Sequence, residues 1–237
     1  MKVLALDASN RPLSIAVLED QQILATTTTT IHQKHAQYLL PIIDQLMDDC
    51  GLAPDDLDRV VVAYGPGSYT GIRIATATAK VLAFTLGIKL VGVSSLQTLA
   101  LNFTREGQLV NPIFDARNQN LFTGLYRIQD GKPMVVIPDQ HVSLERWLAK
   151  LADYQNESII GVADANHFKA QLPSNFTLVQ NLNNLPQAAN LGLFGQTLPP
   201  VQDIDTFVPN YLRLTKAEAD WQKLHPEEDS NSYVEKI

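Results

Sequence analysis

Cysteine, cationic side chains and long apolar runs are all scarce in this 237-residue sequence. The single cysteine, Cys50, excludes an internal disulfide and is typical of a reducing compartment, so we expect a cytoplasmic protein. No apolar run reaches the ~20 residues that a membrane helix needs, and residues 1–7 predict a β-strand rather than a signal peptide. With 18 Lys and Arg against 25 Asp and Glu, the net charge of -7 argues against this chain alone gripping a nucleic-acid backbone. Membership of an assembly whose other members carry the basic surface stays open.

Several catalytic patterns are missing as well. His32 and His35 lie close together, but no third ligand is near them and His-Glu-x-x-His does not occur, so we expect no metal site. The loop 67–71 reads Gly-Ser-Tyr-Thr-Gly and lacks the Gly-x-Ser-x-Gly elbow of serine hydrolases. Neither Gly-x-Gly-x-x-Gly nor Gly-Lys-Ser/Thr, the common phosphate fingerprints, is present. We therefore assign no catalytic residue.

The most informative stretch is 65–73, Gly-Pro-Gly-Ser-Tyr-Thr-Gly-Ile-Arg, which joins an apolar strand to a helix. The β-branched run 59–64 predicts a buried parallel strand, and the small residues that follow predict a helix from Thr70 to a stop at Gly87. Glycines let a backbone approach another group closely, and N–H groups at a helix start attract anions. Two interpretations stay open: a tight turn, or a nucleotide-proximal loop that includes Gly67 and Ser68.

The order of the predicted elements repeats along the chain. Residues 2–29 and 110–137 each read as a strand followed by a β-hairpin, with helices after them. The repetition predicts a duplicated α/β fold with two mixed-sheet halves. We expect the halves at 1–103 and 104–184. A C-terminal helical segment at 185–224 is expected to pack back on the core, and 225–237 to form a flexible polar tail.

Each predicted half has one aspartate at the end of its first strand, and open α/β sheets bind ligands at that end. These are Asp7 and Asp115. Two carboxylates that face a cleft could hold a hydrated metal ion and position a nucleotide phosphate. Alternatively, Asp7 caps a turn through its side chain, as aspartate commonly does. The residues favour the turn, because Arg11 is the one cation near the first predicted hairpin.

Two predicted helices carry faces suited to close packing. On the first, apolar residues recur at helical spacing between positions 36 and 50. On the second, Gly71, Ala75, Ala79 and Ala83 are spaced four apart and form a smooth ridge. Such a ridge allows another helix backbone to approach, inside this chain or on a partner, and most such faces are core.

These segments together resemble the bacterial TsaB (YeaZ) family. The matching segments are 4–9 (Leu-Ala-Leu-Asp-Ala-Ser), His35 with 39–41 (Leu-Leu-Pro), the glycine loop 65–74, 93–100, 115–117 (Asp-Ala-Arg) and 209–213 (Pro-Asn-Tyr-Leu-Arg). The match spans nearly the whole chain in the right order, and its glycine loop is highly specific. The resemblance implies the actin-like ATPase fold (ASKHA, ribonuclease H-like), in agreement with the duplicated halves.

The resemblance also implies a role in making threonylcarbamoyladenosine beside the anticodon of tRNAs that read codons starting with A. In that system the related protein TsaD binds metal and transfers the threonylcarbamoyl group, and an ATPase, TsaE, joins the pair. By the family register, this chain has Ser95 and Leu99 where TsaD has its two metal-binding histidines. A hydroxyl and an isobutyl group cannot hold a catalytic metal there, so the resemblance implies a non-catalytic partner of TsaD.

The family pairs through the first two helices of its N-terminal half. The interface residues implied here are Ala36, Leu39, Leu40, Ile43, Met47, Gly71, Ile72, Ala75, Ala79 and Ala83. We expect no cofactor on this chain alone, tRNA contact only through the complex, and no membrane contact. ATP or ADP at the complex interface and a homodimer of the isolated chain stay open. A stand-alone ATP-dependent phosphotransferase that uses Asp7 and Asp115 is the alternative function, and the absent histidine pair argues against a metalloprotease.

Overall fold

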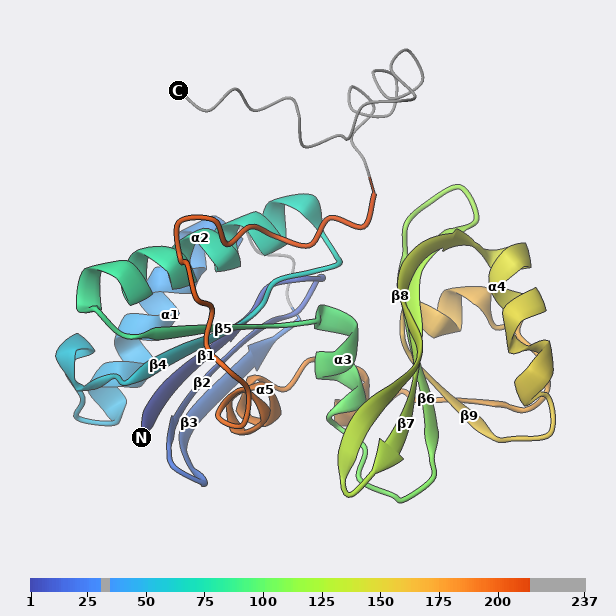
Figure 1. The fold of residues 1–237 in the computed structure, drawn as a ribbon, viewed down its shortest axis with the longest axis horizontal. Helices are drawn as coiled ribbons and strands as arrows, with labels where there is room; N and C mark the ends of the chain where they lie inside the picture. The colour runs from blue at the N-terminus through green and yellow to red at the C-terminus, as the bar shows by residue number, and fades with distance from the viewer. Residues whose placement is uncertain (31–34, 214–237) are drawn as a thin grey trace, which may run out of the picture.

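Two five-stranded mixed sheets lie side by side in the computed structural model, which describes residues 1–30 and 35–213 (Figure 1). The first sheet has the strand order β3-β2-β1-β4-β5. Its strands are β1 (Lys2–Asp7), β2 (Leu13–Glu19), β3 (Gln22–Thr29), β4 (Arg59–Ala63) and β5 (Lys89–Val93). The central strand β1 pairs antiparallel with β2 and parallel with β4.

The second sheet repeats this topology with the order β10-β9-β6-β7-β8. Its strands are β6 (Leu109–Asp115), β7 (Asn120–Gln129), β8 (Lys132–Ser143), β9 (Ile159–Ala163) and β10 (Phe176–Leu178). Strand β6 pairs antiparallel with β7 and parallel with β9, as β1 does with β2 and β4. The duplicated α/β fold predicted from the sequence is therefore confirmed.

Five α-helices lie in the described part of the chain. They are α1 (His35–Asp49), α2 (Tyr69–Leu86), α3 (Ser95–Ala100), α4 (Leu144–Leu151) and α5 (Ala188–Gly195). Four short 3-10 helices are η1 (Pro54–Asp56), η2 (Ala152–Tyr154), η3 (Asp164–Phe168) and η4 (Leu182–Asn184). The side chain of Ser68 caps α2, and Gly87 ends that helix in the left-handed region with φ 66°. In the described part of the chain, no helix has the length and hydropathy that a membrane crossing requires.

Strand alternation gives the first sheet two buried faces. Leu4, Leu6 and Val62 point to the face that α1 and α2 cover. Val3 and Val61, on the same strands, point to the opposite face, which α5 covers. Both faces of β1 and β4 are therefore buried, which explains their continuous apolar sequence.

The two halves exchange a helix. Helix α3 follows the first sheet in sequence, yet its residues Leu96 and Leu99 pack with the second sheet, beside Val110 and Tyr126. Helix α5 follows the second sheet and packs on the first, with Leu191 fully buried. Helix α4 covers the remaining face of the second sheet. Each half therefore depends on an element that lies, in sequence, outside it.

After α5 the chain returns along the first half as an irregular segment, residues 199–213, which we call the C-terminal strap (Figure 1). Its Val201 N–H donates to Leu90 O on the edge strand β5 at 2.8 Å. The Lys80 side chain of α2 donates to the backbone oxygens of Asp205 and Phe207 at 2.9 and 2.8 Å. The strap covers the β5 edge and then follows α2. The polar tail expected at 225–237 lies outside the described residues.

Candidate functional site

The glycine loop packs against backbone of its own chain. A Cβ at Gly67 would overlap the carbonyl of Ser9, and a Cβ at Gly71 would overlap the carbonyl of Ala8. Gly65 has φ 124°, in the region that favours glycine, and a Cβ there would overlap the carbonyl of Asn210. The three glycines therefore let the loop sit between the end of β1 and the C-terminal strap.

Several N–H groups of the loop donate hydrogen bonds within the chain. Gly65 N–H donates to the Ser95 hydroxyl at 3.0 Å, and Ser68 N–H donates to the Ser9 carbonyl at 2.7 Å. Gly71 N–H donates to the Ser68 hydroxyl at 3.4 Å. A phosphate-binding loop presents such groups to a ligand, whereas these are used by the fold. The N–H groups of Gly65, Ser68 and Gly71 are therefore not free to bind a phosphate.

Asp7 lies at the carboxyl end of β1 and is fully buried. Its Oδ1 accepts the Ser9 N–H at 2.8 Å, which is the turn cap that the sequence favours. Its Oδ2 has no hydrogen-bond partner among the described residues. Burial raises the pKa of this carboxyl from 3.8 to about 6. No other described acidic or basic residue forms an ion pair with Asp7, so no opposite charge offsets the cost of burying its carboxylate.

Asp115 holds the same place at the end of β6 but is exposed. Its Oδ1 accepts the Arg117 N–H at 2.7 Å, and its backbone N–H donates to Asp164 Oδ2 at 3.0 Å. Residues 117–119 that follow all have positive φ, between 51° and 67°, so they form a left-handed turn. Within the described ranges, no group of three or more His, Cys, Asp or Glu is placed to hold a metal ion.

Most of the implied interface residues lie inside the chain's own core. Leu39, Ile43, Met47, Gly71, Ile72, Ala75, Ala79 and Ala83 are buried, whereas Ala36 and Leu40 are exposed. The eight buried residues pack within this chain, and Leu39, Ile43 and Met47 of α1 share a core cluster with the small residues of α2. The ridge of small residues therefore takes part in the internal packing of this chain. Pairing through the two helices stays a prediction.

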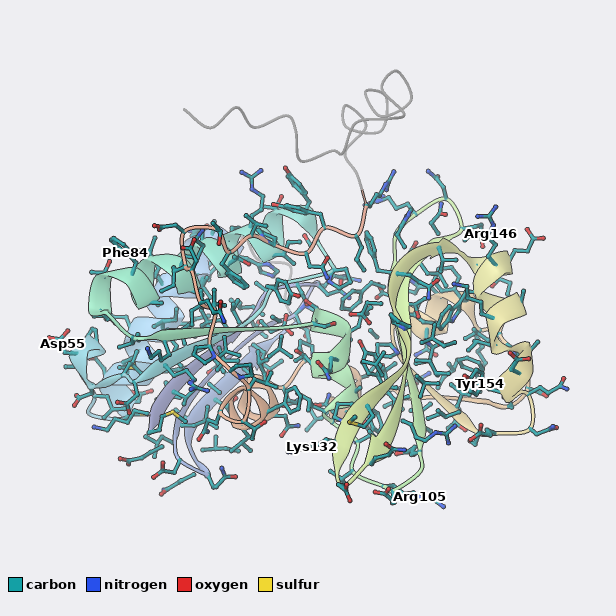
Figure 2. All side chains as sticks on the ribbon, viewed as in Figure 1. Asp55, Phe84, Arg105, Lys132, Arg146 and Tyr154 are labelled. Carbon is teal, nitrogen blue, oxygen red and sulfur yellow. The ribbon has the colours of Figure 1, made fainter. Side chains whose placement is uncertain are left out.

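The outer faces of the same two helices carry exposed apolar side chains. On α2, Tyr69, Val81 and Phe84 are 51%, 63% and 71% exposed, and Figure 2 labels Phe84 at the outer end of the helix. On α1, Tyr38 and Leu40 are exposed. At helical spacing, Tyr69, Val81 and Phe84 fall on one stripe of α2, and large exposed apolar side chains that share a face are typical of protein interaction sites. The helical wheel predicts this face once the buried stripe is known, because exposed and buried stripes alternate around α2.

An aromatic cluster lies at the loop end of α2. The rings of Tyr69 and Tyr211 are 5.2 Å apart, and the Arg73 guanidinium lies over Tyr69 and donates to its hydroxyl at 2.8 Å. Tyr211 belongs to the C-terminal strap, so the strap borders the exposed face of α2. Nearby, the strap and β5 enclose an open hollow of about 580 Å³, lined by Tyr64, Gly92 and Phe207 among others.

Ser95 and Leu99, where the family resemblance implies metal-binding histidines in TsaD, both take part in the packing of this chain. Ser95 is buried, and its hydroxyl accepts the Gly65 N–H. Leu99 is 1% exposed and packs with the apolar face of the second sheet. Neither side chain faces an open space.

Sequence reasoning missed a polar cluster where the halves meet. The Ser94 hydroxyl of the first half and the Tyr126 hydroxyl of the second both donate to the carboxylate of Asp139 on β8. The three residues are far apart in sequence and belong to no recognised motif. The one available signal was a carboxylate in the middle of a strand, where a charge needs partners.

Known proteins resemble this chain in sequence and in fold. The tRNA threonylcarbamoyladenosine biosynthesis protein TsaB of Bacillus subtilis (strain 168) is 38% identical over 226 residues, which cover 93% of this chain and 98% of the relative. The protein of the same name from Escherichia coli (strain K12) is 28% identical over 129 residues, or 54% of this chain and 55% of the relative. The solved structure of YeaZ from Pseudomonas aeruginosa has a TM-score of 0.78 at 28% identity, and the match covers 89% of this chain and 99% of that one. Residues 22–221 match the family model TsaD, tRNA N6-adenosine threonylcarbamoyltransferase.

Two mixed sheets of identical strand order, joined through exchanged helices, define a protein of the actin-like class. The glycine loop of this chain packs against, and donates hydrogen bonds to, backbone of the same chain. The chain belongs to the TsaB (YeaZ) family, within the wider family that the TsaD model describes.

Proposed function

We propose that this chain is the non-catalytic partner of a TsaD-type paralogue. Together with a TsaE-type ATPase, the pair attaches threonylcarbamoyl to the adenosine next to the anticodon of tRNAs that read codons starting with A. The names of the relatives support a role in tRNA threonylcarbamoyladenosine biosynthesis. In this proposal tRNA reaches the chain only through the complex.

The proposal that this chain is not a catalyst rests on the side chains and the burial of Ser95 and Leu99. At these positions the resemblance implies metal-binding histidines in TsaD, and here they are a buried hydroxyl and a buried isobutyl group. The Ser95 hydroxyl is engaged with Gly65, and Leu99 fills the core between α3 and the second sheet. Carbon and hydroxyl groups in these places supply no imidazole ligand for a transition metal.

The exposed faces of α1 and α2 support the partner role. Tyr38, Leu40, Tyr69, Val81 and Phe84 present large apolar side chains to solvent in the described structure. Burial of such a surface between two proteins is favourable by about 25 cal/mol per Å² of apolar area. We infer that these residues, rather than the buried ridge, contact the TsaD-type partner or a second copy of the chain.

The alternative of a stand-alone phosphotransferase has less support. Asp7 is fully buried and its Oδ1 accepts the Ser9 N–H, so the carboxyl is not presented to a hydrated magnesium ion. The N–H groups of Gly65, Ser68 and Gly71 donate within the chain. We therefore propose that the isolated chain binds no nucleotide, and that any ATP or ADP lies at the interface with the partner.

Reconstitution tests the proposal directly. The chain, a TsaD-type enzyme, a TsaE-type ATPase and the adenylate-forming enzyme are mixed with tRNA and labelled threonine, and label on tRNA is measured. We expect no transfer by the chain alone and transfer only when the TsaD-type enzyme and the chain are both present. Equal transfer by the partner without this chain contradicts the proposal.

A matched pair of variants tests the surface. Phe84→Glu places a charge on the exposed face of α2, and Met134→Glu places one on β8 of the second half, where Met134 is 51% exposed. We expect the first variant to lose co-elution with the TsaD-type partner and to lose transfer, and the second to keep both. Loss in both variants, or in neither, rejects the assignment of the face.

A further inference from the structure

Two adjacent serines lie at the junction of β5 and α3, and each makes hydrogen bonds to a different half. Ser95 bonds the first half twice, because its hydroxyl accepts the Gly65 N–H and its own N–H donates to Gly65 O, both at 3.0 Å. Ser94 donates its hydroxyl to Asp139 of the second half. The Ser94 oxygen also accepts the N–H groups of Leu96 and Gln97 at 3.2 Å and so caps α3.

The backbone around Asp139 is shaped to bring the carboxylate to this joint. Thr123 pairs with Gln140 and Leu125 pairs with Ile137, so two residues of β8 face one residue of β7. Such an irregularity re-aims a side chain at the edge of a sheet. The single residue is Gly124, and a Cβ there would lie 2.5 Å from Asp139 Oδ1. Glycine at 124 therefore makes room for the carboxylate.

The carboxylate of Asp139 is held by hydroxyl groups. Its second oxygen accepts the Tyr126 hydroxyl, and no ion pair joins Asp139 to a cation in the described ranges. Burial raises the pKa of Asp139, while the bonds from Ser94 and Tyr126 act in the opposite direction. Burial, together with the nearby Asp139, also raises the pKa of Tyr64 at the end of β4. Burying a carboxylate without a cation costs folding free energy. We therefore expect a role of Asp139 beyond the stability of the second sheet.

The chain passes between the halves at the two ends of α3. It leaves the first sheet at Ser94, between β5 and α3, because α3 packs on the second sheet. It returns at 179–187, between β10 and α5, where the Asn102 side chain donates to the backbone oxygens of Asn183 and Leu185 at 3.0 and 2.8 Å. The two passages are one helix length apart, roughly 9 Å for six residues at 1.5 Å each.

We propose that Asp139 is a latch that fixes the angle between the two halves. Apolar contacts of α3 with the second sheet hold the halves together but are non-directional, whereas hydrogen bonds are directional. At the passage between β5 and α3, Ser95 is bonded to Gly65 of the first half and Ser94 to Asp139 of the second, so directional bonds to both halves set the angle. This inference is independent of the proposed function.

A distance measurement between the halves tests the latch. Asp55 on η1 and Arg146 on α4 lie at opposite ends of the molecule and are exposed (Figure 2). Nitroxide labels at Asp55→Cys and Arg146→Cys, in a Cys50→Ala background, report the distance distribution by double electron–electron resonance. We expect one narrow peak in the full chain. Asp139→Ala removes the carboxylate, and Gly124→Ala displaces it without removing it; in both we expect that peak to be lost to a broad or shifted distribution.

The control is Trp147→Phe, which removes the bond from Trp147 Nε1 to Asn111 Oδ1 inside the second half and leaves Asp139 untouched. It lowers stability without changing the distance distribution. A narrow, unshifted peak in the folded Gly124→Ala and Asp139→Ala variants overturns the latch. Equal broadening in Trp147→Phe also overturns it, because the cause is then a loosened second half. If Asp139→Ala does not fold, as judged by circular dichroism, Gly124→Ala alone decides.

Discussion

Asp7 and Asp115 occupy equivalent places in the two halves and make the same hydrogen bond. Each accepts, through Oδ1, the backbone N–H two residues later, at 2.8 Å from Ser9 and 2.7 Å from Arg117. Their surroundings differ, because Asp7 is fully buried and Asp115 is exposed. The duplicated fold thus keeps the turn in both halves, while the first half alone pays for burying the carboxylate.

Asp7 makes stability depend on pH. Its pKa is about 6 in the folded chain against 3.8 as the ordinary value, so the folded state holds the proton more tightly. The stabilisation is fully present below pH 3.8 and is lost as the pH rises through 6, a change of about 3 kcal/mol. Asp7→Asn keeps an Oδ1 acceptor for Ser9 and does not titrate. We expect the variant to gain stability relative to the native chain as the pH rises from 4.5 to 7.5, measured by urea unfolding.

Thr76→Val is the control for this experiment. The Thr76 hydroxyl is buried with no hydrogen-bond partner among the described residues, and valine has the same shape. It shifts the free energy of unfolding by a constant amount at every pH, because neither side chain titrates in this range. Parallel pH profiles for the native chain and Asp7→Asn would show that Asp7 is ionised throughout.

Much of the fold follows from local sequence. The hairpins, the strand before the glycine loop and the stop at Gly87 depend on neighbouring residues, and the structure has them as predicted. The exchange of α3 and α5 could not be predicted, because periodicity shows that a helix has an apolar face but not which sheet it meets. The latch residues were missed for the same reason.

The predicted interface residues show most clearly how far a sequence pattern alone can predict packing. The sequence pattern marks Ala75, Ala79 and Ala83 as a face for close packing, and that much is confirmed by their burial. Whether the packing is internal depends on the sheet beneath, which includes Leu4 and Val62 from distant segments. The exposed stripe of α2 can be assigned only once the structure shows which stripe of the helix is buried.

Gly71→Ala tests the packing of the glycine loop. In most helices this change is favourable by about 1 kcal/mol, because alanine is the better helix former. Here the new methyl group would overlap the Ala8 carbonyl, a backbone atom that cannot move aside, so we expect a loss of about 1–3 kcal/mol or more in unfolding free energy. Thr70→Ala, at an exposed position of the same turn, should change stability by less than about 0.5 kcal/mol. A higher melting temperature for Gly71→Ala would reject the close approach.

The same substitution at two positions of α2 separates folding from pairing. Ala79 is fully buried and Ala77 is exposed. A tryptophan at position 79 overpacks the core, and we expect a loss of about 3 kcal/mol or more, visible in circular dichroism melting. Ala77→Trp should keep the native melting temperature and weaken co-elution with the TsaD-type partner, because its ring stands on the outer face. A native-like melt for Ala79→Trp contradicts the burial of the ridge.

The exchange of helices predicts a crossed pattern of local stability. Leu99 lies before the second half in sequence and packs within it, and Leu191 lies after it and packs on the first sheet. Truncation of a buried leucine to alanine costs roughly 2–5 kcal/mol. Hydrogen exchange should therefore rise most in β6 and β7 for Leu99→Ala and most in β1 and β4 for Leu191→Ala. If each variant instead loosens the half nearest to it in sequence, the exchange of helices is wrong. If exchange rises equally everywhere, the halves unfold as one unit and the crossed pattern is wrong.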